Sequence, residues 1–272
     1  MSAGDDVAVE LDAVQVGLAA GVGRIVVAGE PSGARVLVGP IDPCGECDVC
    51  RRGGAAVCPL ARRRDSLGAS AIAARRWLVE LGDGLELAMP GAAAVAGDVA
   101  LAYTLYARTG VAPREPVVVV GGSPIGRFLI EVLLAKGIAP AALADAGPWA
   151  DWLRSKGVPV APDRAGLHEV FAAHGISGKP WRVLCVDPDA TEIAVDLAGP
   201  RATLTVLAAG APAIAGSLSA ALAREVTVVG VAGAHPDLVV EAAALCTRGE
   251  IDLVTGTSLT ADSLRTHVRT WP

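Results

Sequence analysis

The second half of the chain alternates short apolar runs with stretches of helical composition, and this alternation constrains the fold more than any other feature. Six runs are predicted strands: Val117–Gly121, Ala141–Asp145, Val158–Val160, Arg182–Asp187, Ala202–Ala208 and Val226–Val231. Helices are expected to begin near Pro124, Pro148, Gly166, Asp189, Ala213 and His235. Such alternation predicts an α/β domain with a doubly wound parallel sheet. Runs that are apolar throughout, such as Val117–Val120, fit strands covered on both faces.

The first part of the chain has a different character. Short runs bounded by Gly-rich turns predict strands at Val7–Leu11, Arg24–Ala28 and Ala34–Val38, and a hairpin is expected in which Trp77–Leu81 and Leu85–Leu87 flank Gly82–Gly84. We therefore expect two domains: an irregular β domain over residues 1–105 and the α/β domain over residues 106–249. The tail, residues 250–272, is expected to leave the α/β domain and return to the β domain.

Composition excludes several classes of protein. Of 272 residues, 52% are hydrophobic and 19% are charged, which argues against disorder. The net charge of -6 gives no support for nucleic-acid binding. The uncharged stretch Ala202–Ala223 is interrupted by Gly210, Pro212 and Gly216, so no membrane span is predicted. Because Met1–Glu10 is acidic and unlike a signal peptide, we expect a cytoplasmic protein.

Four of the six cysteines are clustered, in the spacing C-x2-C-x2-C-x7-C: Cys44, Cys47, Cys50 and Cys58. Four thiolates on one short loop can close a tetrahedral shell around one structural Zn²⁺. Gly45 and Gly53 permit the tight turns that this requires. An iron–sulfur cluster is the rival interpretation, although the x7 gap does not fit the ferredoxin spacing. The other two cysteines, Cys185 and Cys246, stand in apolar segments and are expected to be small buried hydrophobes.

The segment from Gly39 to Cys58, which begins GPIDPCGECDVCRRG, resembles the structural-zinc lobe of zinc-type alcohol dehydrogenases in the medium-chain dehydrogenase/reductase superfamily. Later segments resemble the family in the same order, at Ala135–Gly137, Arg154–Val158 and Arg248–Leu253, so the resemblance runs from about residue 20 to the C-terminus. It implies a GroES-like β domain with a zinc lobe, joined to a Rossmann domain. The chain is shorter than a full family member, which the resemblance places as a truncation at the N-terminus.

A glycine-rich turn follows the first strand of the predicted α/β domain. The dinucleotide fingerprint G-x-G-x-x-G covers Gly121, Gly122, Ser123, Pro124, Ile125 and Gly126, with Ser123 in place of the middle glycine. The first glycine makes the tight turn, and the third lets helix and strand pack closely. We expect Gly121, Gly122, Ser123, Ile125 and Gly126 to bind the cofactor.

Asp145 ends the second predicted strand, where an acid holds the ribose hydroxyls of a dinucleotide. An acid there repels a 2′-phosphate, so NAD(H) is expected in preference to NADP(H). The alternative is a Rossmann-type domain that binds nothing, with Asp145 as an ordinary residue at a strand end.

The resemblance also implies that this chain lacks the family's catalytic zinc ligands. Catalytic zinc in the family is held by an early cysteine, a histidine in a Gly-His-Glu motif, and a cysteine or acid shortly before the dinucleotide domain. This chain has no cysteine before Cys44 and no histidine before His168, and the third position falls on Ala100. The four histidines, His168, His174, His235 and His267, have no metal-ligand spacing. Tyr103 and Tyr106 could donate a proton, although their spacing on an apolar helix also fits packing.

Two functions remain open. The first is an NAD(H)-linked oxidoreductase that works without catalytic zinc, within a complex; the second is a non-catalytic pseudoenzyme that serves as a scaffold or senses NAD(H). In either case we expect a homodimer or a subunit of a larger complex. A run of arginines is either a solvated face or a docking surface for an acidic partner or a phosphate-bearing ligand: Arg51, Arg52, Arg62, Arg63, Arg64, Arg75 and Arg76.

Overall fold

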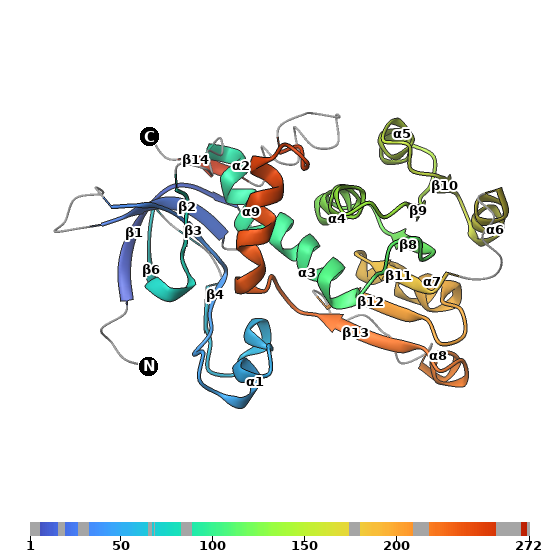
Figure 1. Ribbon diagram of the computed structural model, residues 1–272, viewed down its shortest axis with the longest axis horizontal. Coiled ribbons are helices and arrows are strands. Elements are labelled where there is room, and N and C mark those ends of the chain that lie inside the picture. The colour runs from blue at the N-terminus through green and yellow to red at the C-terminus, as the bar shows by residue number, and fades with distance from the viewer. Residues whose placement is uncertain are drawn as a thin grey trace. The chain divides into compact units, whose positions relative to one another are not determined.

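The computed structural model describes residues 6–15, 20–26, 33–64, 67, 69–82, 89–173, 180–208, 218–253 and 268–270. Its contacts divide the chain into two compact units (Figure 1). Unit 1 comprises Met1–Tyr103, Ala234–Gly256 and Thr260–Pro272, and unit 2 comprises Thr104–Gly233 with Thr257–Leu259. Residues 234–249, which we expected in the α/β domain, therefore group with unit 1.

Unit 1 is built on a six-stranded antiparallel sheet in the order β14-β1-β2-β3-β7, with β6 also paired to β1. The strands are β1 (Asp6–Gln15), β2 (Ala20–Ile25), β3 (Arg35–Val38), β6 (Ser70–Ala74), β7 (Val79–Glu80) and β14 (Val268–Thr270). The long strand β1 pairs with β6 through its first half and with β14 through its second half. Apolar side chains of this sheet, including Val9, Leu11 and Val36, form a buried core.

Short elements complete unit 1. They are β4 (Ile41–Asp42), α1 (Asp48–Arg51), η1 (Ala55–Val57), β5 (Arg62–Arg63), η2 (Arg75–Trp77), α2 (Met89–Ala94), the π-helical η3 (Val95–Val99), η6 (Pro236–Leu238) and α9 (Val239–Thr247). Helix α2 packs on β1 and β2, and α9 packs against η3. Because α9 buries its apolar residues there, it belongs to this unit despite following the last parallel strand. Helix α3 (Ala100–Thr109) carries the chain from unit 1 into unit 2.

Unit 2 contains a six-stranded parallel sheet in the order β10-β9-β8-β11-β12-β13. Its strands are β8 (Val117–Val120), β9 (Pro140–Leu143), β10 (Val160–Ala161), β11 (Arg182–Cys185), β12 (Thr203–Leu207) and β13 (Thr227–Val231). Strands β8, β9 and β10 follow one another toward one edge of the sheet. Strand β11 then lies on the other side of β8, and β12 and β13 continue toward the opposite edge. The carboxyl ends of β8 and β11 therefore flank the point where the strand order reverses, which is where open α/β sheets bind their ligands.

Helices cover both faces of this sheet. They are α4 (Pro124–Ala135), α5 (Pro148–Ser155), α6 (Arg164–Ala173), α7 (Thr191–Leu197) and α8 (Leu218–Ala223), with a short η4 (Pro188–Ala190) before α7. In Figure 1, α4 and α5 lie on one side of the strands and α7 and α8 lie on the other. Right-handed crossovers require this arrangement when the strand order reverses. Together the two sheets confirm the predicted class: a Rossmann doubly wound sheet plus an irregular, GroES-like β domain.

Local predictions need correction in unit 1. Trp77, expected in a strand, lies in η2, and only Val79–Glu80 of that run is a strand, where it pairs with β3. The second arm of the expected hairpin lies outside the described residues. Strand β6 was not predicted at all, since Ser70–Ala74 lacks the clear alternation of apolar and polar residues that marks a half-buried strand.

No helix in the described part of the chain is both long enough and apolar enough to span a membrane.

A four-cysteine centre and a nucleotide-type pocket

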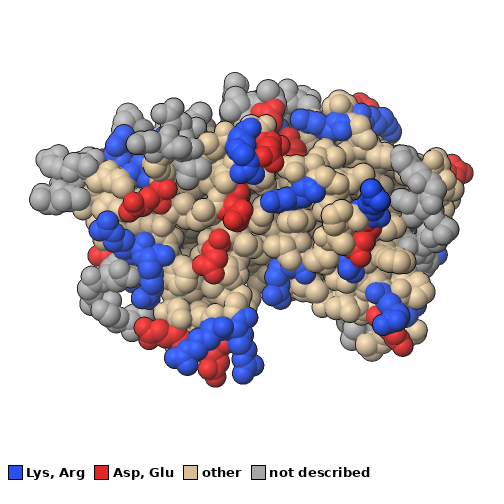
Figure 2. All heavy atoms as spheres, in the orientation of Figure 1, with Lys and Arg blue, Asp and Glu red and all other residues tan. Residues whose placement is uncertain are grey.

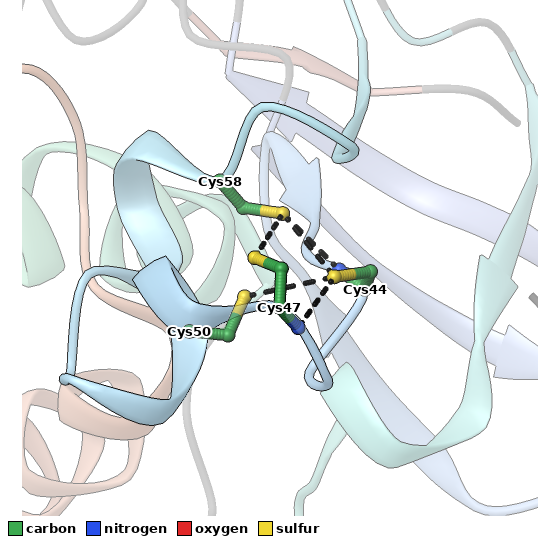
Figure 3. Close-up of side chains that lie close together, drawn as sticks. All are labelled: Cys44, Cys47, Cys50 and Cys58. Atoms are coloured by element: carbon green, nitrogen blue, oxygen red, sulfur yellow. Dashed lines mark hydrogen bonds between the residues drawn. The ribbon is translucent and has the colours of Figure 1, made fainter.

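The four clustered cysteines converge on one point in unit 1 (Figure 3). Cys44 follows β4, Cys47 and Cys50 lie at α1, and Cys58 follows η1. Positive φ angles at Gly45 (+75°) and Gly53 (+78°) turn the backbone on either side of α1, a conformation that glycine adopts without strain. Among the described residues, this is the only group of three or more cysteine, histidine or acidic side chains that could hold a metal.

The distances between the sulfurs match those of a zinc shell. All four Sγ atoms lie within 4.8 Å of one another, and the short pairs are Cys44–Cys58 at 3.6 Å, Cys47–Cys58 at 3.8 Å and Cys44–Cys50 at 3.9 Å. Four sulfurs held tetrahedrally about 2.3 Å from a zinc ion would be about 3.8 Å apart. All four positions are filled by protein, so the residues fit a closed, structural zinc site.

Backbone N–H groups prepare this centre for negative charge. The N–H of Cys47 donates to Cys44 Sγ at 3.4 Å, and the N–H of Cys44 donates to Cys58 Sγ at 3.5 Å. Donors at Glu46 and Cys47 lower the pKa of the Cys44 thiol to about 6. Desolvation and the neighbouring thiols raise the pKa of Cys50 to about 12. The cluster therefore resists ionising all four sulfurs unless a cation compensates their charge.

Three side chains fasten this loop to the rest of unit 1. Trp77 Nε1 donates to the carbonyl of Pro43 at 2.7 Å, and Arg76 donates to the carbonyl of Cys44 at 3.2 Å. His235 Nε2 lies 2.8 Å from the carbonyl oxygen of Gly53, and because that oxygen can only accept, Nε2 carries the proton. Each of these bonds reaches a residue far away in the sequence, which is why the sequence did not indicate them.

The arginine run is largely engaged within unit 1. Arg62 pairs with Asp6 at 2.7 Å, Arg64 pairs with the buried Asp42, and Arg75 lies 3.7 Å from Glu80. Figure 2 shows basic and acidic side chains interspersed on the face in view. These three arginines are therefore engaged within unit 1, which argues against a docking role for them.

In unit 2 the glycine-rich turn joins β8 to α4. Gly121 has φ of +107°, and a Cβ atom there would lie 2.6 Å from Cβ of Asp187, so no other residue fits without displacement. A Cβ atom at Gly126 would lie 3.0 Å from the carbonyl oxygen of Gly121. Ser123 is the N-cap of α4, where its Oγ accepts from the N–H of Gly126 at 3.2 Å. Its hydroxyl thus fills a helix-capping role.

A pocket of about 440 Å³ opens at the carboxyl ends of the strands in unit 2. Gly121 and Gly122 line it from the turn, Asp145 lines it from beyond β9, and Asp187 lines it from beyond β11. Its volume is within the range of small-molecule sites. Its only charged lining residues in the described part of the chain are the two aspartates, so no cation is present there to neutralise a phosphate on a ribose 2′-hydroxyl.

The structure thus brings Gly121, Gly122 and Asp145 together at one pocket. Ser123, Ile125 and Gly126, also expected at the cofactor, lie in the first turn of α4 and are not among the residues that line the pocket. Sequence reasoning missed Asp187 and Trp149, which do line it. The position of Asp187 at the end of a predicted strand was a usable signal, whereas nothing in the sequence placed Trp149 against the glycine turn.

Residues considered as possible catalytic groups from the sequence lie as follows. Ala100 is fully buried at the start of α3. His168 is exposed on α6, His235 contacts Gly53, and His174 and His267 lie outside the described residues. Tyr103 is buried and Tyr106 is half-buried on α3. Cys185 and Cys246 are buried as expected, and burial raises the pKa of the Cys185 thiol to about 11.

Neither the family models nor the curated sequences compared with the chain match it. Solved structures do. An alcohol dehydrogenase from Escherichia coli, complexed with NADH, is 18% identical over 93% of this chain and 83% of its own, with a TM-score of 0.74. An alcohol dehydrogenase from a Thermus species is 17% identical over 93% and 84%, with a TM-score of 0.77. Galactitol-1-phosphate dehydrogenase from Escherichia coli is 17% identical over 97% and 90%, with a TM-score of 0.75. The chain therefore has the two-domain fold of these dehydrogenases.

Proposed function

We propose that the chain is an NAD(H)-binding oxidoreductase of the medium-chain dehydrogenase/reductase type, with one structural zinc and no catalytic zinc. The observation that carries this proposal is the pocket at the strand-order reversal, where the tight Gly121 turn meets Asp145 and Asp187. The likeness to a dehydrogenase complexed with NADH supports it. Nicotinamide cofactors supply the hydride chemistry, while the protein positions the cofactor and excludes its competitors.

The site residues that we propose are those of the turn and the acid beyond β9. Gly121 and Gly122 let the backbone approach the pyrophosphate, Ser123, Ile125 and Gly126 form the helix start behind it, and Asp145 accepts hydrogen bonds from the ribose hydroxyls. The structural zinc is assigned to the four clustered cysteines, whose geometry fits it.

We predict that NADH binds more tightly than NADPH. Asp145 is exposed at the pocket, and the lining there has two carboxylates and no cation among the described residues, so a 2′-phosphate meets only negative charge. Isothermal titration calorimetry of both cofactors measures the preference, and Asp145→Ala should narrow it to within a few fold. Equal affinities for the wild type would contradict the assignment of Asp145.

The competing function is a non-catalytic pseudoenzyme that scaffolds a complex or senses NAD(H). The absence of family zinc ligands at Ala100 and before Cys44 favours it. The two functions separate on a substrate panel. We predict no chelator-sensitive oxidation of simple alcohols, because the alkoxide that zinc stabilises has no such support here. Reduction of enones with NADH, lost in Tyr103→Phe, would select the enzyme, and inactivity on the whole panel despite NADH binding would select the pseudoenzyme.

We also propose that the chain forms a homodimer or joins a larger complex. Strand β13 ends the parallel sheet, with Val228 37% exposed, and Leu222 on α8 is 67% exposed. Edge strands with exposed apolar residues favour pairing with another chain. The uncharged segment Ala211–Leu222, which the family resemblance places at a dimer interface, lies mostly outside the described residues. Light scattering after size-exclusion chromatography should give at least twice the monomer mass for a homodimer. A clean monomer would contradict the homodimer and leave only a complex with another chain.

A further inference from the structure

One aromatic side chain in the pocket has no role in the fingerprint. Trp149, near the start of α5, lines the pocket and lies directly against the glycine turn. A Cβ atom at Gly122 would be only 2.8 Å from Trp149 Cδ1 and 3.1 Å from Nε1. The missing side chain of Gly122 therefore makes room for the indole edge, and any larger residue there would push the ring away.

The ring is held rigidly from behind. Trp149 stacks on the buried Trp152, with ring centroids 5.1 Å apart and an interplanar angle of 11°. Trp152 is flanked in turn by two cations, the Arg127 guanidinium at 5.6 Å and the Lys156 ammonium at 5.7 Å. Glu131 joins both cations, at 3.6 Å and 3.5 Å. A ring fixed in this way loses little further conformational entropy when a ligand binds.

The indole N–H of Trp149 is the second observation. Its nitrogen is buried and has no hydrogen-bond partner in the part of the chain that the structure describes. A buried donor without a partner costs free energy, so packing around the ring, and not a hydrogen bond of its own, holds Trp149 in place. One face of the ring is covered by Trp152, and the residue also lines the pocket.

We propose that Trp149 is the specificity-determining residue for the adenosine end of a bound adenine dinucleotide. Its ring stacks on the flat, apolar part of the nucleoside. The adenosine end is favoured because Trp149 lines the same pocket as Asp145, assigned to the ribose, and packs against Gly122 of the turn. The inference rests on the proposed NAD(H) function and adds to it the group that selects the ligand.

Calorimetric titration with NADH and with ADP-ribose tests the inference. Trp149→Phe keeps a ring, but a smaller one with less area to stack, so both ligands should bind about fivefold more weakly. Trp149→Leu removes the ring altogether, and the loss should reach about tenfold or more. Trp181→Phe is the matched control: Trp181 is 58% exposed, directly before β11 and outside the pocket lining, and its replacement should leave both affinities unchanged.

A substitution that leaves Trp149 in place provides an independent test. Gly122→Ala has no positive φ to strain it, but its Cβ must displace the indole. It should weaken ADP-ribose binding at least as much as Trp149→Leu does, and the losses in the double variant should be less than additive, because both changes disturb the same contact. Thermal unfolding checks that each variant is folded. If Trp149→Leu does not fold, the binding measured for Trp149→Phe decides the test.

The outcomes separate the two proposals. Wild-type affinity of all Trp149 variants for NADH overturns the role of Trp149 and leaves the function standing. Weaker NADH binding with unchanged ADP-ribose binding places Trp149 at the nicotinamide end and overturns the inference. If the wild type binds neither ligand, the proposed function and the inference are both wrong.

Discussion

Replacing Cys47 with serine will remove the metal from unit 1 and destabilise its loop. Wild-type protein should carry about one zinc per chain and no iron, because the four sulfurs fit one closed tetrahedral shell. With three thiols left, the affinity falls steeply, and binding energy that held the loop folded is lost. We expect the zinc content to approach zero after dialysis against a chelator, with a loss of several kcal/mol in the stability of unit 1. Elemental analysis and denaturant unfolding measure the two effects.

Cys246→Ala is the matched control for this prediction. Cys246 is buried in the same unit, on α9, but lies outside the cluster. Its replacement should leave a small packing defect and full zinc content. Iron in the wild-type protein would support the iron–sulfur alternative, and undiminished zinc in Cys47→Ser would show that the cluster is not the metal site.

Replacing Arg127 with methionine should cost unit 2 about 3 kcal/mol, the second large effect that we expect. Arg127 is 2% exposed and lies 3.6 Å from Glu131, which is itself 3% exposed. Removing one member of a buried pair leaves the other charge in a poorly solvated position. Lys156, 3.5 Å from Glu131, compensates only in part because its side chain is 36% exposed and solvated. Urea unfolding followed by tryptophan fluorescence measures the loss.

The double variant Arg127→Met/Glu131→Met distinguishes the effect of the charge pair from the effect of packing. Replacing both charges with apolar side chains of similar size removes the unpaired carboxylate, so most of the lost stability should return. Additive losses in the double variant would show that packing around Arg127 matters and the charge pair does not.

The parallel sheet was predictable because its strands are short apolar runs that need no partner to be recognised. All six were found within a few residues of their observed ends, and the starts of α4 and α5 were marked by Pro124 and Pro148. Unit 1 was harder, because its strands are defined by pairing across long stretches of sequence. Strand β6 has no distinct pattern of its own and is recognisable only from its pairing with β1.

The candidate site was likewise predictable only where its residues form local sequence patterns. The cysteine spacing and the glycine turn are local patterns whose chemistry follows from residue type, and both could be read directly. Ser123 looked like a defect in the fingerprint and is a helix cap, since its hydroxyl finds the N–H of Gly126 three residues on. Trp149 meets Gly122 through tertiary packing, and neither residue alone points to that contact.

Strand β1 pairs with β6 and also with β14, near the other end of the chain. This pairing affects the order in which the chain folds during synthesis. Unit 2 is almost contiguous in sequence, so its parallel sheet can form as soon as residues 104–233 have left the ribosome. Unit 1 needs α9 and the β14 strand at Val268–Thr270, which pairs with Ala13–Gln15 from the other end of the chain. The β domain, although synthesised first, is therefore completed last, and its early strands spend most of translation with an unpaired edge.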